Sequence, residues 1–284
     1  MAGVLADAPE CGEGGIAIHQ RHEGPERLKH RAMDRIDRAA QGLKAFVLLF
    51  ALTFVAGAPG VFNIPALDRD ESRFAQASKQ MVETGDYILI RYQDELRNKK
   101  PAGIHWLQAG SVAALSEPGA GEIWPYRVPS WIGVSLATVT AFWAGLALIG
   151  RPAAFLGALM FGSTLLLTSE AHISKTDGVL VFLTTLGMAA LARLYVQQDN
   201  DRRLALLFWV AMGLGFLIKG PVTPLVAGLA MGGLYLWDGR RADWMRSLVW
   251  WPGPALFVLL VLPWFLWVQI ASSGEYLEGP VGKD

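Results

Sequence analysis

Long stretches without a single charged residue constrain this chain more than any other feature. They are spread along it, at Ala45–Leu67, Val128–Gly150, Pro152–Ser169, Gly178–Ala192, Gly220–Trp237 and Ser247–Gly274. A helix needs about 20 apolar residues to cross the roughly 30 Å hydrocarbon core of a bilayer, and most of these stretches are long enough. Charged residues make up 18% of the chain, against about 25% in soluble domains. We therefore predict an all-α polytopic membrane protein.

The number of spans follows from these windows. We expect about seven, at residues 43–66, 128–149, 152–169, 178–196, 204–219, 221–237 and 248–270. The fifth is short, but it ends at Lys219, whose aliphatic stem can carry the ammonium group to the interface.

The Lys and Arg residues between the spans predict their orientation. With the N-terminus in the cytoplasm, the inner loops and adjacent span ends hold Arg151, Arg193, Arg202, Arg203, Arg240, Arg241 and Arg246. The short outer loops and adjacent span ends hold only Lys175 and Lys219. An excess of basic residues marks cytoplasmic loops.

This orientation divides the chain. Residues 1–42 become a cytoplasmic tail, 43–270 a membrane domain that includes a large outer loop at 67–127, and 271–284 the start of another outer loop. The uncharged stretch Pro101–Ser116 could be an eighth span, but that would invert every later loop. We expect an interfacial or buried helix there, with the inverted topology as the alternative.

Several classes of partner and site are not indicated. The formal net charge is +0, and no basic block interleaved with aromatic residues suggests a nucleic-acid partner. Cys11 is the single cysteine, which excludes an internal disulfide framework and a zinc cluster. His172 has no second His or Cys at ligand spacing, so we predict no metal site.

The polar residues expected outside begin with the stretch DRDESRF at 68–74. Asp68 and Glu71 fit a capping box that opens a helix. An apolar stripe at helical spacing follows, at Phe74, Ala77, Met81 and Val82. The cap does not require Asp70. A carboxylate beside Arg73 at this boundary can act as a base or stabilise a developing positive charge.

A hairpin should follow this helix. Weak alternation around Gln93–Glu95 predicts two short strands that return the chain to the membrane at Lys100-Pro101. Proline holds the residue before it extended. An ammonium group on a fixed segment suits a phosphate, although snorkelling near lipid headgroups explains Lys100 equally well.

The stretch Glu170–Asp177 gathers ionisable side chains between two predicted spans. His172, Lys175 and Asp177 all fall in it. Either they contribute to a site at the outer surface, or Lys175 and Asp177 simply pair with each other.

Four short motifs in this order resemble a known family. They are Asp70-Glu71-Ser72-Arg73, Lys100-Pro101, Arg127-x-Pro-Ser130 and Lys175-Thr-Asp177-Gly178. Together they resemble the GT-C glycosyltransferases of the protein O-mannosyltransferase and aminoarabinose (lipid A) transferase superfamily, which are glycosyltransferase family 39-like. The resemblance runs from about Leu43 to the last residue.

The resemblance implies an inverting, multi-pass transferase of the bacterial inner membrane. It would move a sugar from a polyprenyl-phosphate carrier to lipid A, another envelope glycan, or protein Ser/Thr on the periplasmic face. The lipid-linked sugar would be its donor substrate, membrane lipids its surroundings, and no cofactor would be required. Relatives continue beyond this chain, so we expect a C-terminally truncated piece that is inactive alone.

The resemblance also implies roles for individual residues. Asp70 matches the catalytic acidic position, and Lys100 matches the lysine that holds the carrier phosphate. The remaining predicted binding residues are Arg73, Glu71, Arg127, Lys175, Asp177 and His172. Ala102 stands where the family often has a proline.

A transporter or flippase of a lipid-linked sugar is the alternative from another class. Transporter sites lie near the middle of the membrane, whereas the predicted spans here are almost free of ionisable residues.

Overall fold

The computed structural model describes residues 36–66, 68–97, 100–116, 121–197, 201–239 and 243–274. Most of the predicted cytoplasmic tail and residues 275–284 lie outside these ranges, as do Arg240 and Arg241. The predictions made for those residues are therefore not addressed by the structure.

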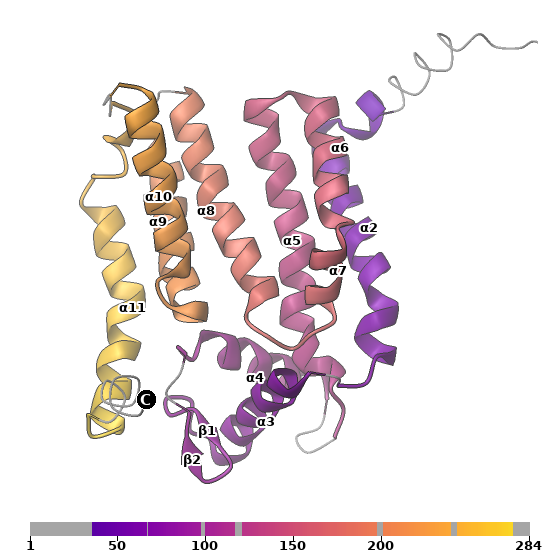
Figure 1. Cartoon of the computed structure of the whole chain (residues 1–284), viewed down its shortest axis with the longest axis vertical. Coiled ribbons are helices and arrows are strands. Elements are labelled where there is room, and N and C mark those ends of the chain that lie inside the picture. Colours follow the sequence, from indigo (N-terminus) through magenta and orange to yellow (C-terminus); the bar gives the residue numbers. More distant parts are fainter. Residues whose placement is uncertain are drawn as a thin grey trace, which may run out of the picture.

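A bundle of helices that run roughly side by side forms the body of the protein (Figure 1). Its helices are α2 (Gly42–Asn63), α5 (Trp124–Leu148), α6 (Arg151–Gly162), α7 (Leu165–Ala171), α8 (Asp177–Gln197), α9 (Arg202–Lys219), α10 (Val222–Trp237) and α11 (Pro252–Ala271). A short 3-10 helix, η1 (Asp243–Met245), lies between α10 and α11. The helical prediction is confirmed.

Length and composition separate these helices into groups. Among the described residues, α2, α5, α8 and α11 are long and apolar enough to cross a membrane. The bent pair α6–α7 brings that number to 5 if it counts as one span. Helix α9 has charged residues at both ends, and α10 has only 16 residues. Each of the predicted spans is thus a helix, or a helix pair, of the bundle.

The third predicted span differs from the expectation of one continuous helix. Helices α6 and α7 meet at an angle of 58°. At the break, the Ser163 hydroxyl donates to the Met160 carbonyl at 3.1 Å, and the Thr164 hydroxyl donates to the Phe161 carbonyl at 2.9 Å. The Thr164 hydroxyl also accepts from the amide of Leu167, at 3.4 Å, and caps α7. Side-chain hydroxyls that bond to nearby backbone compete with a continuous helix.

The segment between α2 and α5 gathers at one end of the bundle (Figure 1). It holds α3 (Arg69–Thr84), the strands β1 (Arg91–Tyr92) and β2 (Glu95–Leu96), and α4 (Gly103–Leu115). The predicted hairpin is confirmed, with Tyr92 opposite Glu95. Helix α4 lies at this end, packed against α3 and against the start of α5, and does not run the length of the bundle, as expected for a buried helix outside the spans. We call α3, the hairpin and α4 the end layer.

The sides of the bundle are apolar, and charged residues lie at its ends. Large apolar side chains of α2, α10 and α11 are exposed, including Val55, Leu229 and Ile270. Such a surface suits lipid and not water. Arg193 and Arg202 lie on the helix ends away from the end layer, where they contact the rings of Trp143 and Trp250.

Helices α5 and α8 approach each other closely near the start of α8, with glycine on both sides. A methyl group added at Gly133 would lie 2.7 Å from the carbonyl oxygen of Gly178. One added at Gly178 would lie 2.8 Å from the carbonyl oxygen of Ser130. Small residues let membrane helices approach in this way, and here they place the start of α8 against α5.

This contact yields a prediction about stability. Gly133→Ala should lower the free energy of unfolding by about 1–3 kcal/mol, because backbone cannot yield to the added methyl group. Gly228→Ala is the matched control, since nothing lies within 4 Å of a methyl group there. Thermal unfolding in detergent would compare the two variants. Equal midpoints would contradict the close approach.

Candidate active site

A buried ion pair joins the end layer to the bundle. Arg127, on the first turns of α5, is fully buried, and Glu71 of α3 is 2% exposed. The Arg127 Nε donates to Glu71 Oε1 at 2.7 Å, and Nη2 donates to Oε2 at 3.1 Å. The remaining donors of Arg127 reach carbonyl oxygens at the end of α2, including that of Val61 at 3.0 Å. A planar guanidinium group is suited to this many fixed partners.

The role of Glu71 corrects part of the capping-box prediction. Asp68 is the N-cap of α3, and its carboxylate accepts from the Asp70 amide at 2.8 Å, as expected. Glu71 does not turn back to close the box. Its carboxylate accepts from Arg127 and from the Ser174 amide, at 3.0 Å, inside the protein. A buried guanidinium is a stronger partner than a solvated backbone amide.

Of two further ion pairs, one joins the α7–α8 loop to the N-cap of α3, and the other joins the end of α9 to the start of α8. The Lys175 ammonium pairs with Asp68, and the Lys219 ammonium at the end of α9 pairs with Asp177. The alternative in which Lys175 pairs with Asp177 is therefore wrong. Hydrogen bonds from Lys175 and from the Asp70 amide lower the pKa of the Asp68 carboxyl. These pairs bring side chains far apart in the sequence to one end of the bundle.

Asp70 is more open to solvent than the paired carboxylates of Asp68 and Asp177. Its side chain is 49% exposed, and Arg73 Nη1 lies 3.5 Å from Asp70 Oδ1. Glu71, the adjacent residue, is buried, so neighbouring carboxylates of α3 face in different directions. The rotation of the helix explains this difference, because successive residues differ by about 100° around the axis.

Lys100 is placed by the aromatic ring of Phe74. Its Nζ lies 4.8 Å from the ring centroid, and the Arg97 guanidinium carbon lies 5.2 Å from the same centroid. Burial lowers the pKa of the Lys100 ammonium, and the positive charge of Lys219 lowers it further. The negative charges of Asp177 and Asp70 act in the opposite direction. These charges therefore share one electrostatic neighbourhood, which we call the charged cluster: Asp70, Arg73, Arg97, Lys100, Asp177 and Lys219.

The structure brings together some predicted site residues and gives others different surroundings. Asp70, Arg73, Lys100 and Asp177 belong to the charged cluster, and Lys175 lies beside it on Asp68. Glu71 and Arg127 face each other in the interior. His172 packs against α2, with its Nε2 3.0 Å from the Gly57 carbonyl oxygen.

Arg97 and Lys219 were not among the predicted site residues. Lys219 had a signal, because it ends a span on the same side as the predicted site. Arg97 had only its place after the hairpin. Nothing in the sequence told which basic residue the hairpin would turn towards Phe74.

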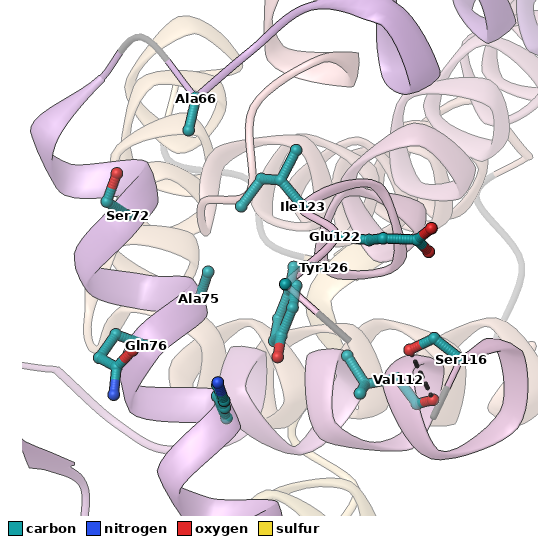
Figure 2. A pocket seen from close by; sticks show the side chains of 11 residues that line it. Ala66, Ser72, Ala75, Gln76, Val112, Ser116, Glu122, Ile123 and Tyr126 are labelled. Carbon is teal, nitrogen blue, oxygen red and sulfur yellow. Dashed lines mark hydrogen bonds between the residues drawn. The ribbon is translucent and has the colours of Figure 1, made fainter. Parts of the chain in front are cut away.

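A hollow lies beside α3 (Figure 2), and no residue of the charged cluster lines it. Its volume is about 260 Å³, and its walls include Ala75 and Gln76 of α3, Val112 of α4, and Ile123 and Tyr126. Lys79 also lines it and pairs with Glu83 at 3.7 Å. This hollow is therefore separate from the residues with the predicted chemistry. Among the described residues, no group of His, Cys, Asp or Glu is arranged to hold a metal ion.

The fold and the cluster define a class of protein. It is a helical membrane protein that holds an exposed carboxylate and several cations at one end of its bundle. The family model described as "Dolichyl-phosphate-mannose-protein mannosyltransferase" matches residues 47–273. The chain belongs to this family, and the resemblance seen in its sequence motifs is confirmed.

Named relatives agree with this assignment. The chain is 26% identical over 227 residues to the undecaprenyl phosphate-alpha-4-amino-4-deoxy-L-arabinose arabinosyl transferase 2 of Pseudomonas fluorescens (strain Pf0-1). That match covers 78% of this chain and 39% of the relative. A transferase of the same name, without the number, from Pseudomonas aeruginosa (strain UCBPP-PA14) is 29% identical over 213 residues. That match covers 73% of this chain and 37% of the relative.

Solved structures show the same fold. ArnT from Cupriavidus metallidurans bound to undecaprenyl phosphate matches with a TM-score of 0.70 at 23% identity, over 81% of this chain and 42% of that one. The apo form of ArnT matches with a TM-score of 0.73 at 22% identity, over 86% and 45%. The GT-C membrane fold is thus confirmed. This chain spans about two fifths of the length of the relatives it matches.

The buried pair gives a prediction that separates neighbouring carboxylates. Glu71→Ala should cost about 3–5 kcal/mol of stability, because it leaves the Arg127 charge buried without a counter-charge. Asp70→Ala should cost at most about 1 kcal/mol, since its pair is exposed. Chemical unfolding in detergent would measure both. A cost for Glu71→Ala no larger than that for Asp70→Ala would contradict the conclusion that the buried Arg127–Glu71 ion pair stabilises the fold.

A second prediction concerns pH. Burial, with the charges of Arg97 and Lys100, lowers the pKa of His105 in α4 from 6.5 to about 3. The folded protein therefore keeps this ring neutral while the unfolded chain protonates below about pH 6.5. The free energy of unfolding should fall by about 1.4 kcal/mol per pH unit from this group as the pH drops below 6.5. His105→Asn should remove that part of the slope, measured by unfolding midpoints at pH 7.5 and 5.

Proposed function

We propose that this chain contains the donor-binding and catalytic region of a membrane glycosyltransferase. The enzyme would move a sugar from undecaprenyl phosphate to lipid A. The observation that carries the proposal is the charged cluster, in which Asp70 is exposed while Lys100 and Lys219 share its neighbourhood. The named relatives support the choice of carrier and sugar class, since they are aminoarabinose transferases that use undecaprenyl phosphate.

Each part of the cluster has a task in this reaction. Lys100, with Lys219, would hold the carrier phosphate and stabilise the negative charge that develops on it as the bond from the sugar C1 to the phosphate oxygen breaks. An acceptor oxygen attacks C1 from the opposite face, and the bonding electron pair leaves with the carrier phosphate, which inverts the configuration at C1.

The task of Asp70 depends on the acceptor. With a lipid A phosphate, which is already anionic, Asp70 would stabilise the positive charge that grows at the sugar ring or orient the acceptor. With a hydroxyl acceptor, the Asp70 carboxylate would take its proton. A hydroxyl of another envelope glycan or of protein Ser/Thr would need the second task.

Burial divides the predicted binding residues into two roles. Arg73, Lys175 and Asp177 are partly exposed near the cluster and would line the donor site. Glu71, Arg127 and His172 have partners inside the protein, and we propose that they position α2, α3 and the α7–α8 loop around it.

The orientation proposed here places the cluster on the periplasmic face of a bacterial inner membrane and the N-terminus in the cytoplasm. The arginines at the opposite end of the bundle support it, because basic residues collect on the cytoplasmic side. The lipid-linked donor requires no separate cofactor in this proposal. The position of the cluster at one end, and not half-way along the helices, disfavours a transporter.

The test uses the protein as its gene encodes it, in a strain from which that gene is deleted. Wild-type protein should restore the sugar on lipid A, as measured by mass spectrometry. Asp70→Asn should lower kcat by roughly 10²–10³-fold, because a charge that stabilises the transition state is lost, while binding undecaprenyl phosphate normally. Lys100→Ala should weaken that binding by about tenfold or more, because a charge-assisted hydrogen bond is lost.

Lys79→Ala is the control, because it removes a lysine from a different face of α3. It should change neither turnover nor carrier binding. Normal turnover in Asp70→Asn would show that Asp70 is only a residue of the first helical turn. If the deletion strain has unchanged lipid A but lacks a sugar on proteins or on another glycan, then that molecule is the acceptor in place of lipid A. If no glycan changes, a flippase is favoured.

A further inference from the structure

A chain of buried hydrogen bonds runs beneath the charged cluster. The Ser78 hydroxyl of α3 donates to Gln108 Oε1 of α4 at 2.6 Å, and His105 Nδ1 lies 2.8 Å from the same hydroxyl oxygen. Gln108 Nε2 donates to the Ser174 hydroxyl at 2.8 Å. The Ser174 amide donates to Glu71, which continues to Arg127. We call Ser78, His105, Gln108 and Ser174 the polar relay, and each is at most 1% exposed.

The relay has one consistent placement of protons. Gln108 donates to Ser174, so its carbonyl oxygen accepts the single proton of the Ser78 hydroxyl. Ser78 must then accept from His105, which therefore carries its proton on Nδ1. The pKa of His105, lowered to about 3 by burial and by the charges of Arg97 and Lys100, keeps the ring neutral. Buried polar groups are costly unless paired, so a satisfied relay favours one arrangement of its segments.

The relay reaches residues that are next to the proposed site in the sequence. Ser174 is adjacent to Lys175, and Glu71, which accepts from the Ser174 amide, is adjacent to Asp70. The His105 ring stacks on Phe74 with 5.3 Å between centroids. The same Phe74 ring contacts Lys100 and Arg97. The relay is thus connected to three segments that carry charged residues: the start of α3, the α7–α8 loop, and the segment with Arg97 and Lys100.

We propose that Gln108 is the positioning residue of this site, because its amide joins α3, α4 and the α7–α8 loop. It would fix the distances from Lys100 to Asp70 and to the loop that leads to Asp177 at the values that sugar transfer requires. Gln108 itself would not contact the substrate. This inference rests on the proposed glycosyl transfer, where misplacement of reacting groups by about 1 Å can cost roughly 10²-fold in rate.

The test replaces Gln108 by methionine, which has a similar size but makes neither hydrogen bond. Gln108→Met should lower kcat by about ten- to a hundredfold in folded protein. The affinity for undecaprenyl phosphate should change less than about threefold, since Lys100 and its Phe74 contact remain. Gln76→Met makes the same change in α3, at a residue that lines the separate hollow, and should leave kcat unchanged.

Conservative variants separate positioning from general packing. His105→Asn can place an amide donor near the former Nδ1 and should retain kcat within about threefold, whereas His105→Leu should lose about tenfold. If Gln108→Met does not fold, Ser174→Ala removes a single partner of the Gln108 amide and should lower kcat in the same direction. Wild-type kcat in folded Gln108→Met or Ser174→Ala would overturn the proposal, as would equal loss in His105→Asn and His105→Leu.

A cross-linking measurement keeps the test independent of activity. With Cys11→Ser, cysteines in place of Asp68 and Lys175 report whether α3 and the loop stay aligned, using a short bismaleimide. Gln108→Met should lower the cross-linking yield at least about twofold if the relay sets this distance. An unchanged yield would refute positioning. Absence of sugar transfer by the wild type would instead refute the proposed function.

Discussion

The buried guanidinium of Arg127 is the interaction on which the arrangement of the site depends. A charge taken out of water must regain its partners inside the protein, and here they come from two segments, α3 and the end of α2. Glu71 supplies the counter-charge, and the carbonyl oxygens of Val61 and Ile64 supply further acceptors. The last carbonyl groups of a helix lack partners within it, so the end of α2 is well suited to receive them. Helix α3 is therefore held against α2 and α5 at the membrane boundary.

The buried ion pair of Arg127 and Glu71 does not include the neighbouring charged residues Asp70 and Lys100. Arg127 and Glu71 satisfy each other and are closed to solvent, whereas Asp70, one residue away, is 49% exposed. Lys100 lies over an aromatic face, and no carboxylate within the described residues forms an ion pair with it. An ammonium group without a carboxylate partner fits the phosphate-binding role proposed for Lys100, because a bound phosphate would supply the missing counter-charge.

The sequence was sufficient for much of the fold, for physical reasons. Uncharged windows of span length predicted the long helices, because the hydrocarbon core excludes charge. Asp68 was recognised as a cap, and the hairpin around Gln93 was recognised from its alternation, because both signals are local. The partners of Glu71, Lys175 and Asp177 were not predicted correctly. Each pairs with a residue more than 40 positions away in sequence, and no local pattern encodes such a choice.

Helix α4 shows why an uncharged window alone does not make a span. The stretch Pro101–Ser116 is free of charge, yet its helix has only 13 residues, about 20 Å at 1.5 Å per residue. It also carries His105 and Gln108, whose polar atoms would be costly to leave unpaired in lipid. Their partners lie on α3 and in the α7–α8 loop, so the helix can bury its polar face only beside them, at the end of the bundle. The polar groups that α4 buries here, His105 and Gln108, are thus the same groups that join it to α3 and to the α7–α8 loop.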